Sequence, residues 1–243
     1  MRSNSFFQLT VRLFVALVAM VFGRPVIAQE SSSRQEFWPE VDLYLKLNQR
    51  SRLVFTYSAT REDNLQTYAE GLSGAYIDYY ALPWLRSKLR QHADASRDKF
   101  LMFRIGYLFS RTPSTIRSAA GNEHTIRLEA TTRFPLPRGL LLTDRNRGDL
   151  QWVNGAPKPR YRNRAQMERS FLVRHFDVRP YGSAEVFYDW QYDKFDRVRF
   201  AAGVEVSVWR FLVIDGYYLR QHTTTSSPRF VNAMGLKMHI YLR

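Results

Sequence analysis

One stretch at the end of the chain constrains the fold more than any other. From residue 230 to residue 242 nearly every even position is apolar, whereas the odd positions include Lys237, His239 and Tyr241. Alternation with a period of two places the two kinds of side chain on opposite faces of a β-strand. A strand of this length exceeds most strands of soluble sheets, and it matches the length at which a tilted strand crosses a bilayer.

The same alternation recurs along the chain, in residues 41–47, 53–59, 75–81, 101–109, 126–134 and 198–208. Short connections near residues 48–51, 135–139 and 209–210 take turns with longer polar ones at 61–66, 111–123, 154–159 and 222–228. Tight turns on one side and longer loops on the other are typical of outer-membrane barrels. We therefore expect an all-β fold, a single closed antiparallel transmembrane β-barrel of about 10–12 strands.

The alternation yields a count of about eleven strands, whereas bacterial single-chain barrels have an even number. An even number requires one strand more or one strand fewer than the alternation shows. The assignment of strands is least certain in residues 140–152, because the alternation breaks at Asp144 and Arg145 and a bulge would explain the break. The region before Trp38 is the other such region. An even count predicts antiparallel pairing between the last strand and a first strand near residues 38–48, and an odd count predicts parallel pairing.

The N-terminal segment predicts export. Arg2 and Arg12 give a positive start, residues 13–22 are apolar but too few to span a membrane as a helix, and Ala28 precedes a plausible cleavage site. We expect residues 1–28 to be a cleaved signal peptide, 29–37 a polar segment and 38–243 the barrel. An uncleaved membrane anchor is the alternative. A cleaved signal on a strand-rich chain predicts the outer membrane of a Gram-negative bacterium.

Composition agrees with a barrel. Aromatic residues make up 15% of the chain, which suits aromatic girdles at the two bilayer interfaces. The absence of cysteine excludes disulfides and a lipoprotein-type anchor. Lys and Arg outnumber Asp and Glu by 36 to 22. We expect no nucleic-acid partner, because the basic residues are spread along amphipathic strands without a recognition helix.

Many charged residues fall on the polar face of the predicted strands. Three of them, Arg160, Arg162 and Arg164, lie two apart and predict a ladder of guanidinium groups on one face of a strand. We expect Glu129, Glu168 and Glu185 as partners of this ladder. The whole predicted lumen charge network is Arg104, Arg127, Glu129, Arg133, Arg160, Arg162, Arg164, Glu168, Glu185, Arg199 and Glu205. Such a network either fills a narrow barrel structurally or lines a pore or pocket for an anion.

Catalytic and cofactor signals are weak, and we expect neither an enzyme activity, nor a metal, nor a cofactor. The five histidines lack metal-ligand spacing, and no glycine-rich phosphate loop is present. A serine hydrolase would need a serine beside a histidine and an orienting acid. The pairing of His222 with Ser226 and Ser227 lacks the acid, and His239 on the polar face of the last strand could meet an acid of a neighbouring strand.

Three segments together resemble an uncharacterised family of Gram-negative outer-membrane β-barrels that is catalogued as a domain of unknown function. They are the early strand pair from Trp38-Pro39-Glu40-Val41 into Leu53-Val54-Phe55, the arginine-rich run at 160–164, and the closing strand with Gly235. The resemblance covers the mature chain and implies a barrel topology. It implies no catalytic residues, because the family has no agreed activity.

The sequence therefore predicts an outer-membrane β-barrel that is a narrow pore lined by Arg and Glu or a structural barrel. Two alternatives remain, a lipid-modifying enzyme in the same membrane and a soluble periplasmic barrel that binds an apolar ligand inside. The expected partners are outer-membrane lipid, lipopolysaccharide phosphates near Arg111, Arg117, Lys158 and Arg160, and the barrel-assembly machinery. That machinery favours a final strand ending on an aromatic residue, whereas this chain ends Tyr241-Leu242-Arg243.

Overall fold

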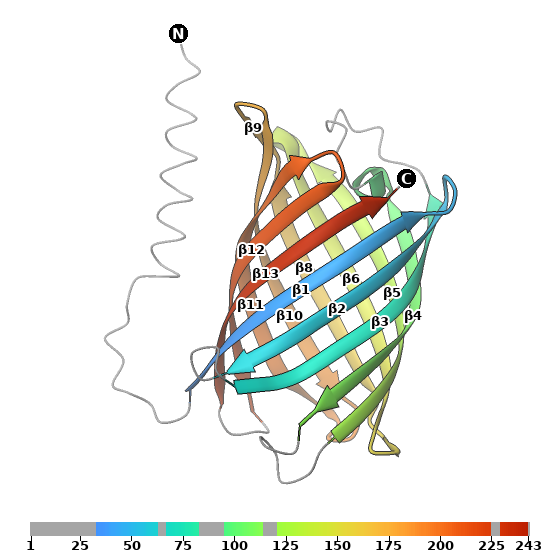
Figure 1. Ribbon diagram of the computed structural model, residues 1–243, viewed down its shortest axis with the longest axis vertical. Coiled ribbons are helices and arrows are strands. Elements are labelled where there is room, and N and C mark those ends of the chain that lie inside the picture. The colour runs from blue at the N-terminus through green and yellow to red at the C-terminus, as the bar shows by residue number, and fades with distance from the viewer. Residues whose placement is uncertain (1–32, 63–66, 83–94, 114–120, 225–228, 243) are drawn as a thin grey trace. The chain divides into compact units, whose positions relative to one another are not determined.

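The computed structural model describes residues 33–62, 67–82, 95–113, 121–224 and 229–242. Their architecture is a cylinder of tilted strands (Figure 1). The predicted signal peptide, residues 1–28, lies outside the described residues. Strand β1 begins at Ser33, so it includes part of the segment that we expected to precede the barrel. No helix in the described part of the chain is long and apolar enough to cross a membrane.

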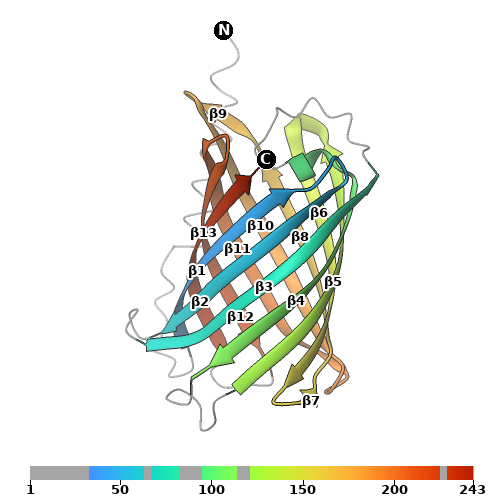
Figure 2. The ribbon, with the colours of Figure 1, turned by 45° about the vertical axis from the view of Figure 1, so that its right-hand side comes forward.

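Eleven long strands form the wall of the barrel. They are β1 (Ser33–Lys46), β2 (Ser51–Glu62), β3 (Thr67–Leu82), β4 (Leu101–Thr112), β5 (Gly121–Leu136), β6 (Leu140–Val153), β8 (Arg160–Arg169), β10 (Phe176–Asp189), β11 (Lys194–Trp209), β12 (Leu212–Thr223) and β13 (Phe230–Leu242). The short strands β7 (Ala156–Pro157) and β9 (Phe171–Val173) extend hairpins at opposite ends of the cylinder (Figure 2). Two 3₁₀ helices, η1 (Ala95–Asp98) and η2 (Pro137–Gly139), lie in connections.

The sheet closes on itself through a parallel seam between β1 and β13. Their register runs from Ser33 opposite Phe230 to Leu45 opposite Leu242, while the long neighbours elsewhere in the wall pair antiparallel. Both arrowheads point the same way in Figure 1. Eleven strands confirm the count from the alternation, and the expectation of an even number is wrong. Strand direction alternates around the cylinder, so an odd number forces the first and last strands to run parallel.

The two rims of the barrel differ in their connections. At the rim where β13 ends, here called the C-terminal rim, β11 and β12 are joined by two residues, and η2 turns β5 into β6. Arg138 and Gly139 in η2 have φ of 64° and 73°, the left-handed values of a tight turn. The strand ends that flank the longer polar connections predicted at 61–66, 111–123, 154–159 and 222–228 lie at the opposite N-terminal rim. The long β3–β4 connection, which contains η1, lies at the C-terminal rim.

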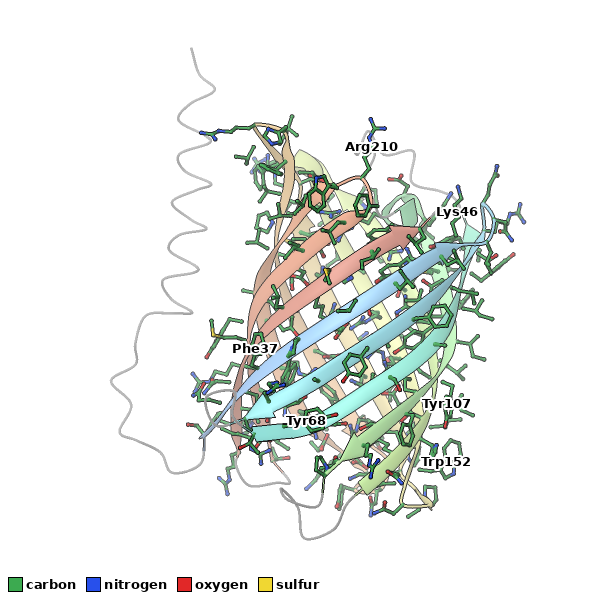
Figure 3. All side chains as sticks on the ribbon, viewed as in Figure 1. Phe37, Lys46, Tyr68, Tyr107, Trp152 and Arg210 are labelled. Atoms are coloured by element: carbon green, nitrogen blue, oxygen red, sulfur yellow. The ribbon has the colours of Figure 1, made fainter. Side chains whose placement is uncertain are left out.

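The outer face is apolar and the inner face is polar. Phe200 and Met234 are 60% and 64% exposed on the outside, whereas Asp78 and Asp149 inside are fully buried. Tyr107, labelled in Figure 3, is one of the exposed outer aromatic residues. This polarity is the reverse of a soluble barrel that holds an apolar ligand, so that alternative is wrong.

Inward glycines make room for inward tyrosines in this narrow wall. A Cβ atom on Gly235 of β13 would lie 1.9 Å from Cζ of Tyr217 on β12, and one on Gly106 would lie 2.2 Å from Cδ1 of Tyr76. No side chain can be accommodated at such distances without moving the ring. The glycines are therefore required by close packing of the lumen wall rather than by backbone conformation.

Strand β6 does not contain the bulge that we considered at its centre. Its registers with β5 and with β8 run without a shift, and Asp144 lies opposite Thr132 on one side and Ala165 on the other. The alternation breaks at Asp144 because a polar residue stands on the outer face, not because the strand bends.

Candidate functional site: an arginine-rich lumen

The lumen encloses a cavity of about 1120 Å³ that is lined by inward side chains of the long strands. Ten of the eleven predicted network residues line it: Arg104, Arg127, Arg133, Arg160, Arg162, Arg164, Glu168, Glu185, Arg199 and Glu205. The eleventh, Glu129, is buried on the same face of β5, beneath the side chains of the neighbouring strands. The structure thus brings the whole predicted set to one surface of the sheet.

Asp78 on β3 sits between two arginines of the adjacent strands. Its Oδ2 accepts a hydrogen bond of 2.7 Å from Nε of Arg52 on β2. Arg104 on β4 donates from Nε to Oδ1 at 2.6 Å and from Nη2 to Oδ2 at 2.9 Å. A fully buried carboxylate is stable only with such charged donors, and here two guanidinium groups share one carboxylate.

Asp149 on β6 repeats this arrangement. Nε of Arg127 on β5 donates to its Oδ1 at 2.7 Å, and Arg162 on β8 donates from Nε to Oδ2 at 2.9 Å. We expected the ladder to pair with Glu129, Glu168 or Glu185, but the carboxylate partner of Arg162 is Asp149. The reason is register, because Asp149 lies opposite Arg160 and next to Arg162 across the β6–β8 ladder.

Two glutamates continue the network around the wall. Glu129 accepts a 2.8 Å bond from Nη2 of Arg147 and lies 3.9 Å from Nε of Arg145. Glu185 on β10 lies 3.9 Å from Nη2 of Arg145 and 3.2 Å from Nη1 of Arg199 on β11. Alternating cations and carboxylates therefore run around the inner wall from β2 to β11.

Positive charge exceeds negative charge most on β6 and β8. Arg145 lies opposite Arg164, and Arg147 lies opposite Arg162, so like charges face each other in two consecutive rows. Directly opposed like charges destabilise a sheet unless a counter-charge is supplied. In the described residues, neither Arg160 nor Arg164 forms an ion pair with a carboxylate, and Nη2 of Arg164 donates to Oε1 of Gln166 at 3.0 Å.

Arg197 on β11 lies near the N-terminal rim, where Asp189 and Asp196 are also buried. It forms no ion pair with a described carboxylate, its guanidinium lies 5.2 Å from the ring centroid of Phe187, and its Nε is buried without a hydrogen-bond partner. Nε of Arg160 is buried and unbonded in the same way. Two cavity-lining guanidinium groups thus retain donors that no described protein group satisfies.

The 3₁₀ helix η1 contacts the lumen wall near the C-terminal rim through Arg97. Arg97 of η1 forms ion pairs with Glu168 on β8 and with Glu205 on β11. Glu205 also lies 3.3 Å from Nη2 of Arg179. The carbonyl oxygen of Lys99 accepts a bond of 3.4 Å from Nη1 of Arg133. These contacts join η1 and Lys99 to the inner wall of the barrel near this rim.

The wall around the β1–β13 seam carries more carboxylates. His239 meets an acid of a neighbouring strand, with Nδ1 at 3.2 Å from Oδ2 of Asp42. Lys237 donates to Oε1 of Glu40 at 2.8 Å, and the hydroxyl of Tyr181 donates to Asp215 at 3.0 Å. No serine or threonine hydroxyl of the described residues bonds to His239. The other pairing, His222 with Ser226 and Ser227, lies partly outside the described residues.

Sequence reasoning missed several members of the network. Arg145, Arg147 and Asp149 are absent from the predicted network, because the alternation of their strand breaks at Asp144. The odd positions of β6 from Thr143 to Gln151 are nevertheless all polar, and this signal could have identified the three residues. Arg97 could not have been found in this way, because it reaches the lumen from a connection with no strand pattern.

Polar side chains inside and apolar side chains outside a closed sheet define an outer-membrane-type β-barrel. The sequence assigns the chain further: residues 35–232 match the family described as "Protein of unknown function (DUF2490)", and the chain belongs to that family. No curated protein sequence matches it.

Two solved outer-membrane barrels are similar in fold. LpxR from Salmonella typhimurium shares 8% identity over 83% of this chain and 87% of its own, with a TM-score of 0.51. The β-domain of the Bordetella autotransporter BrkA shares 14% identity over 79% of this chain and 83% of its own, with a TM-score of 0.45. At these identities the likeness concerns the fold alone.

Proposed function

We propose that this protein is an exported barrel of a Gram-negative outer membrane whose lumen binds and conducts small anions. One observation supports this proposal above all. Arg160, Arg164 and Arg197 line the cavity without forming an ion pair with a described carboxylate. Rings and rows of unneutralised cations select anions in pores.

Several other arginines of the lumen share their carboxylates. A lattice that only filled the lumen would match each guanidinium with a carboxylate, because an unpaired buried charge is unfavourable. Here Asp78, Asp149 and Glu185 each form ion pairs with two arginines. Arg160, Arg164 and Arg197 then have no described carboxylate within ion-pair distance. A bound anion supplies the missing charge and accepts the donors that the protein leaves free.

Catalysis has less support, and we propose that the protein is not an enzyme. The His239–Asp42 pair would orient an imidazole, but no serine or threonine hydroxyl of the described lumen is hydrogen-bonded to His239. A lipid-modifying activity would need such a nucleophile within hydrogen-bond reach. We also propose lipopolysaccharide phosphates as partners of Arg111 and Lys158 at the N-terminal rim, whereas Arg160 serves the lumen. Recognition of β13 by the barrel-assembly machinery is part of the same proposal.

Conductance through the refolded protein in a planar bilayer tests the function. With a salt gradient across the bilayer, we expect a reversal potential on the anion-selective side. The triple substitution Arg160→Gln, Arg164→Gln and Arg197→Gln should move that potential toward cation selectivity. The matched control is Arg210→Gln, because Arg210 lies in an exposed turn at the rim (Figure 3) and its loss should leave selectivity unchanged.

Three outcomes would contradict the proposal. They are a folded barrel that carries no current, a current that is selective for cations, and a triple variant with unaltered selectivity. Heat-modifiable migration in gels establishes that each variant is folded, so loss of current through misfolding is distinguished from a closed lumen.

A further inference from the structure

The outer face of the barrel carries a polar cluster in the middle of an otherwise apolar belt. It consists of Asp144 and Asn146 on β6 with Tyr161 and Asn163 on β8, here called the outer polar patch. These residues share the outward face with the exposed residues Leu150 and Met167, and none of them lines the lumen. The patch is therefore directed away from the charge network.

The patch lies well inside the strands. Asp144 is the fifth residue of β6, which places it about 13 Å along the strand from the C-terminal end of the wall. The apolar belt of such a barrel is about 25 Å tall, so the patch falls within the hydrocarbon zone. A charged carboxylate facing lipid there is strongly unfavourable, and Asp144 forms no ion pair with a described residue.

Hydrogen bonds within the patch satisfy most of its polar groups and leave one donor and one acceptor. Asp144 accepts bonds from Nδ2 of Asn146 at 2.8 Å and from Nδ2 of Asn163 at 2.7 Å. Oδ1 of Asn146 accepts from Asn163 at 3.1 Å and from the hydroxyl of Tyr161. Among the described residues, one N–H of Asn146 and the Oδ1 of Asn163 have no partner, since a carboxamide has two donors and one acceptor oxygen.

Several residues beside the patch are small, although Val186 and Tyr188 on β10 stand opposite Asn163 and Tyr161. Ala130 lies opposite Asn146, and the row through Asp144 continues with Ala165 on β8 and Ala184 on β10. Elsewhere the outer face carries bulky side chains such as Phe103 and Ile105. Within membranes, small residues with a polar pair mark surfaces where proteins approach each other closely.

We propose that the outer polar patch is the interface with a second copy of this chain in the membrane. The patch offers one donor, on Asn146, and one acceptor, Oδ1 of Asn163. Across a two-fold axis, Asn146 of one copy donates to Oδ1 of Asn163 of the other, and the reciprocal bond forms as well. An isologous contact of this kind closes as a dimer. A different protein would need a separate complementary surface, whereas a second copy already supplies both groups.

Site-specific crosslinking in the native membrane tests this interface, because the chain contains no cysteine. Ala165→Cys and Ala130→Cys border the patch, and Ile105→Cys lies on the outer face of β4. With a short bifunctional maleimide, the first two variants should give a covalent product of twice the mature mass. Ile105→Cys should remain monomeric under the same conditions.

A second pair of variants connects the crosslink to the patch. Adding Asn146→Leu and Asn163→Leu to the Ala165→Cys protein should abolish the product, while Asn232→Leu, an outward asparagine on β13, should leave it unchanged. Heat-modifiable migration confirms folding. Absence of the dimer, equal crosslinking at residue 105, persistence after the double substitution, or a product whose mass includes a different protein would each overturn the proposal.

Discussion

Tyr44 and Tyr241 stack face to face across the seam of the barrel, with ring centroids 4.6 Å apart and planes inclined by 10°. The two residues stand directly opposite each other in the parallel register of β1 and β13, which are the first and last strands of the described chain. Tyr44 is buried and belongs to a small core with Val54, Tyr76 and Leu108. The seam is therefore joined by side-chain packing as well as by backbone hydrogen bonds.

The parallel seam predicts which engineered disulfides form. Val41 lies opposite Met238, and Leu43 lies opposite Ile240, so the cysteine pairs 41/238 and 43/240 should both oxidise. An antiparallel seam that kept the second pair would instead bring residue 41 to residue 242. The pair 41/242 is the control, and it should not form. Electrophoresis without reductant distinguishes the linked from the unlinked chain, and a linked 41/242 pair would exclude the parallel register.

Loss of a shared carboxylate should destabilise the barrel strongly. Asp78→Asn removes the buried carboxylate that Arg52 and Arg104 share, and breaking such a buried ion pair costs about 3–5 kcal/mol. The free energy of unfolding in urea, measured in lipid or detergent, gives the value. Asp193→Asn, in an exposed turn, is the control and should have little effect. Similar stability of the two variants would contradict a structural role of Asp78.

The inside–outside assignment predicts unequal tolerance of charge on β11. Val204 faces outward, and Val204→Arg should cost about 2–4 kcal/mol if that face meets the bilayer core. Ala201 lines the lumen, so Ala201→Arg should cost less. Urea unfolding in lipid compares the two variants. Equal cost at both positions would argue against a membrane-facing outer surface.

Release of η1 should widen the lumen. Arg97 holds η1 to Glu168 and Glu205, and Arg97→Gln removes the charge of that contact. We expect a larger single-channel conductance in the planar bilayer, because η1 is no longer held to the inner wall by these ion pairs. The control is again Arg210→Gln. An unchanged conductance with an intact fold would show that η1 does not limit the pore.

Export predicts the mature N-terminus. The small residues before Gln29 favour cleavage after Ala28, so mass spectrometry of the protein from the membrane fraction should begin at Gln29. A mature chain that retains Met1 would support the uncleaved anchor instead. Recovery from the soluble periplasmic fraction would contradict the predicted location.

The fold class could be predicted from the sequence because side-chain alternation is a local property. Each residue of β13 alternates between the two faces, and no distant contact is needed to see it. The same reasoning placed Arg160, Arg162 and Arg164 on one face of a strand. It also reached a count of about eleven strands, although the rule for bacterial barrels argued against an odd number.

Alternation by itself does not say which face of a strand lies inside, how strands are registered, or what a connection does. These depend on contacts between residues far apart in the chain. Asp149 became the partner of Arg162 only through the β6–β8 register, and Arg97 entered the lumen only through the path of the β3–β4 connection. The parallel seam is of the same kind, because closure joins the two ends of the sheet that share no sequence neighbour. Sequence determined the faces of the strands, and the tertiary structure decided which charges meet.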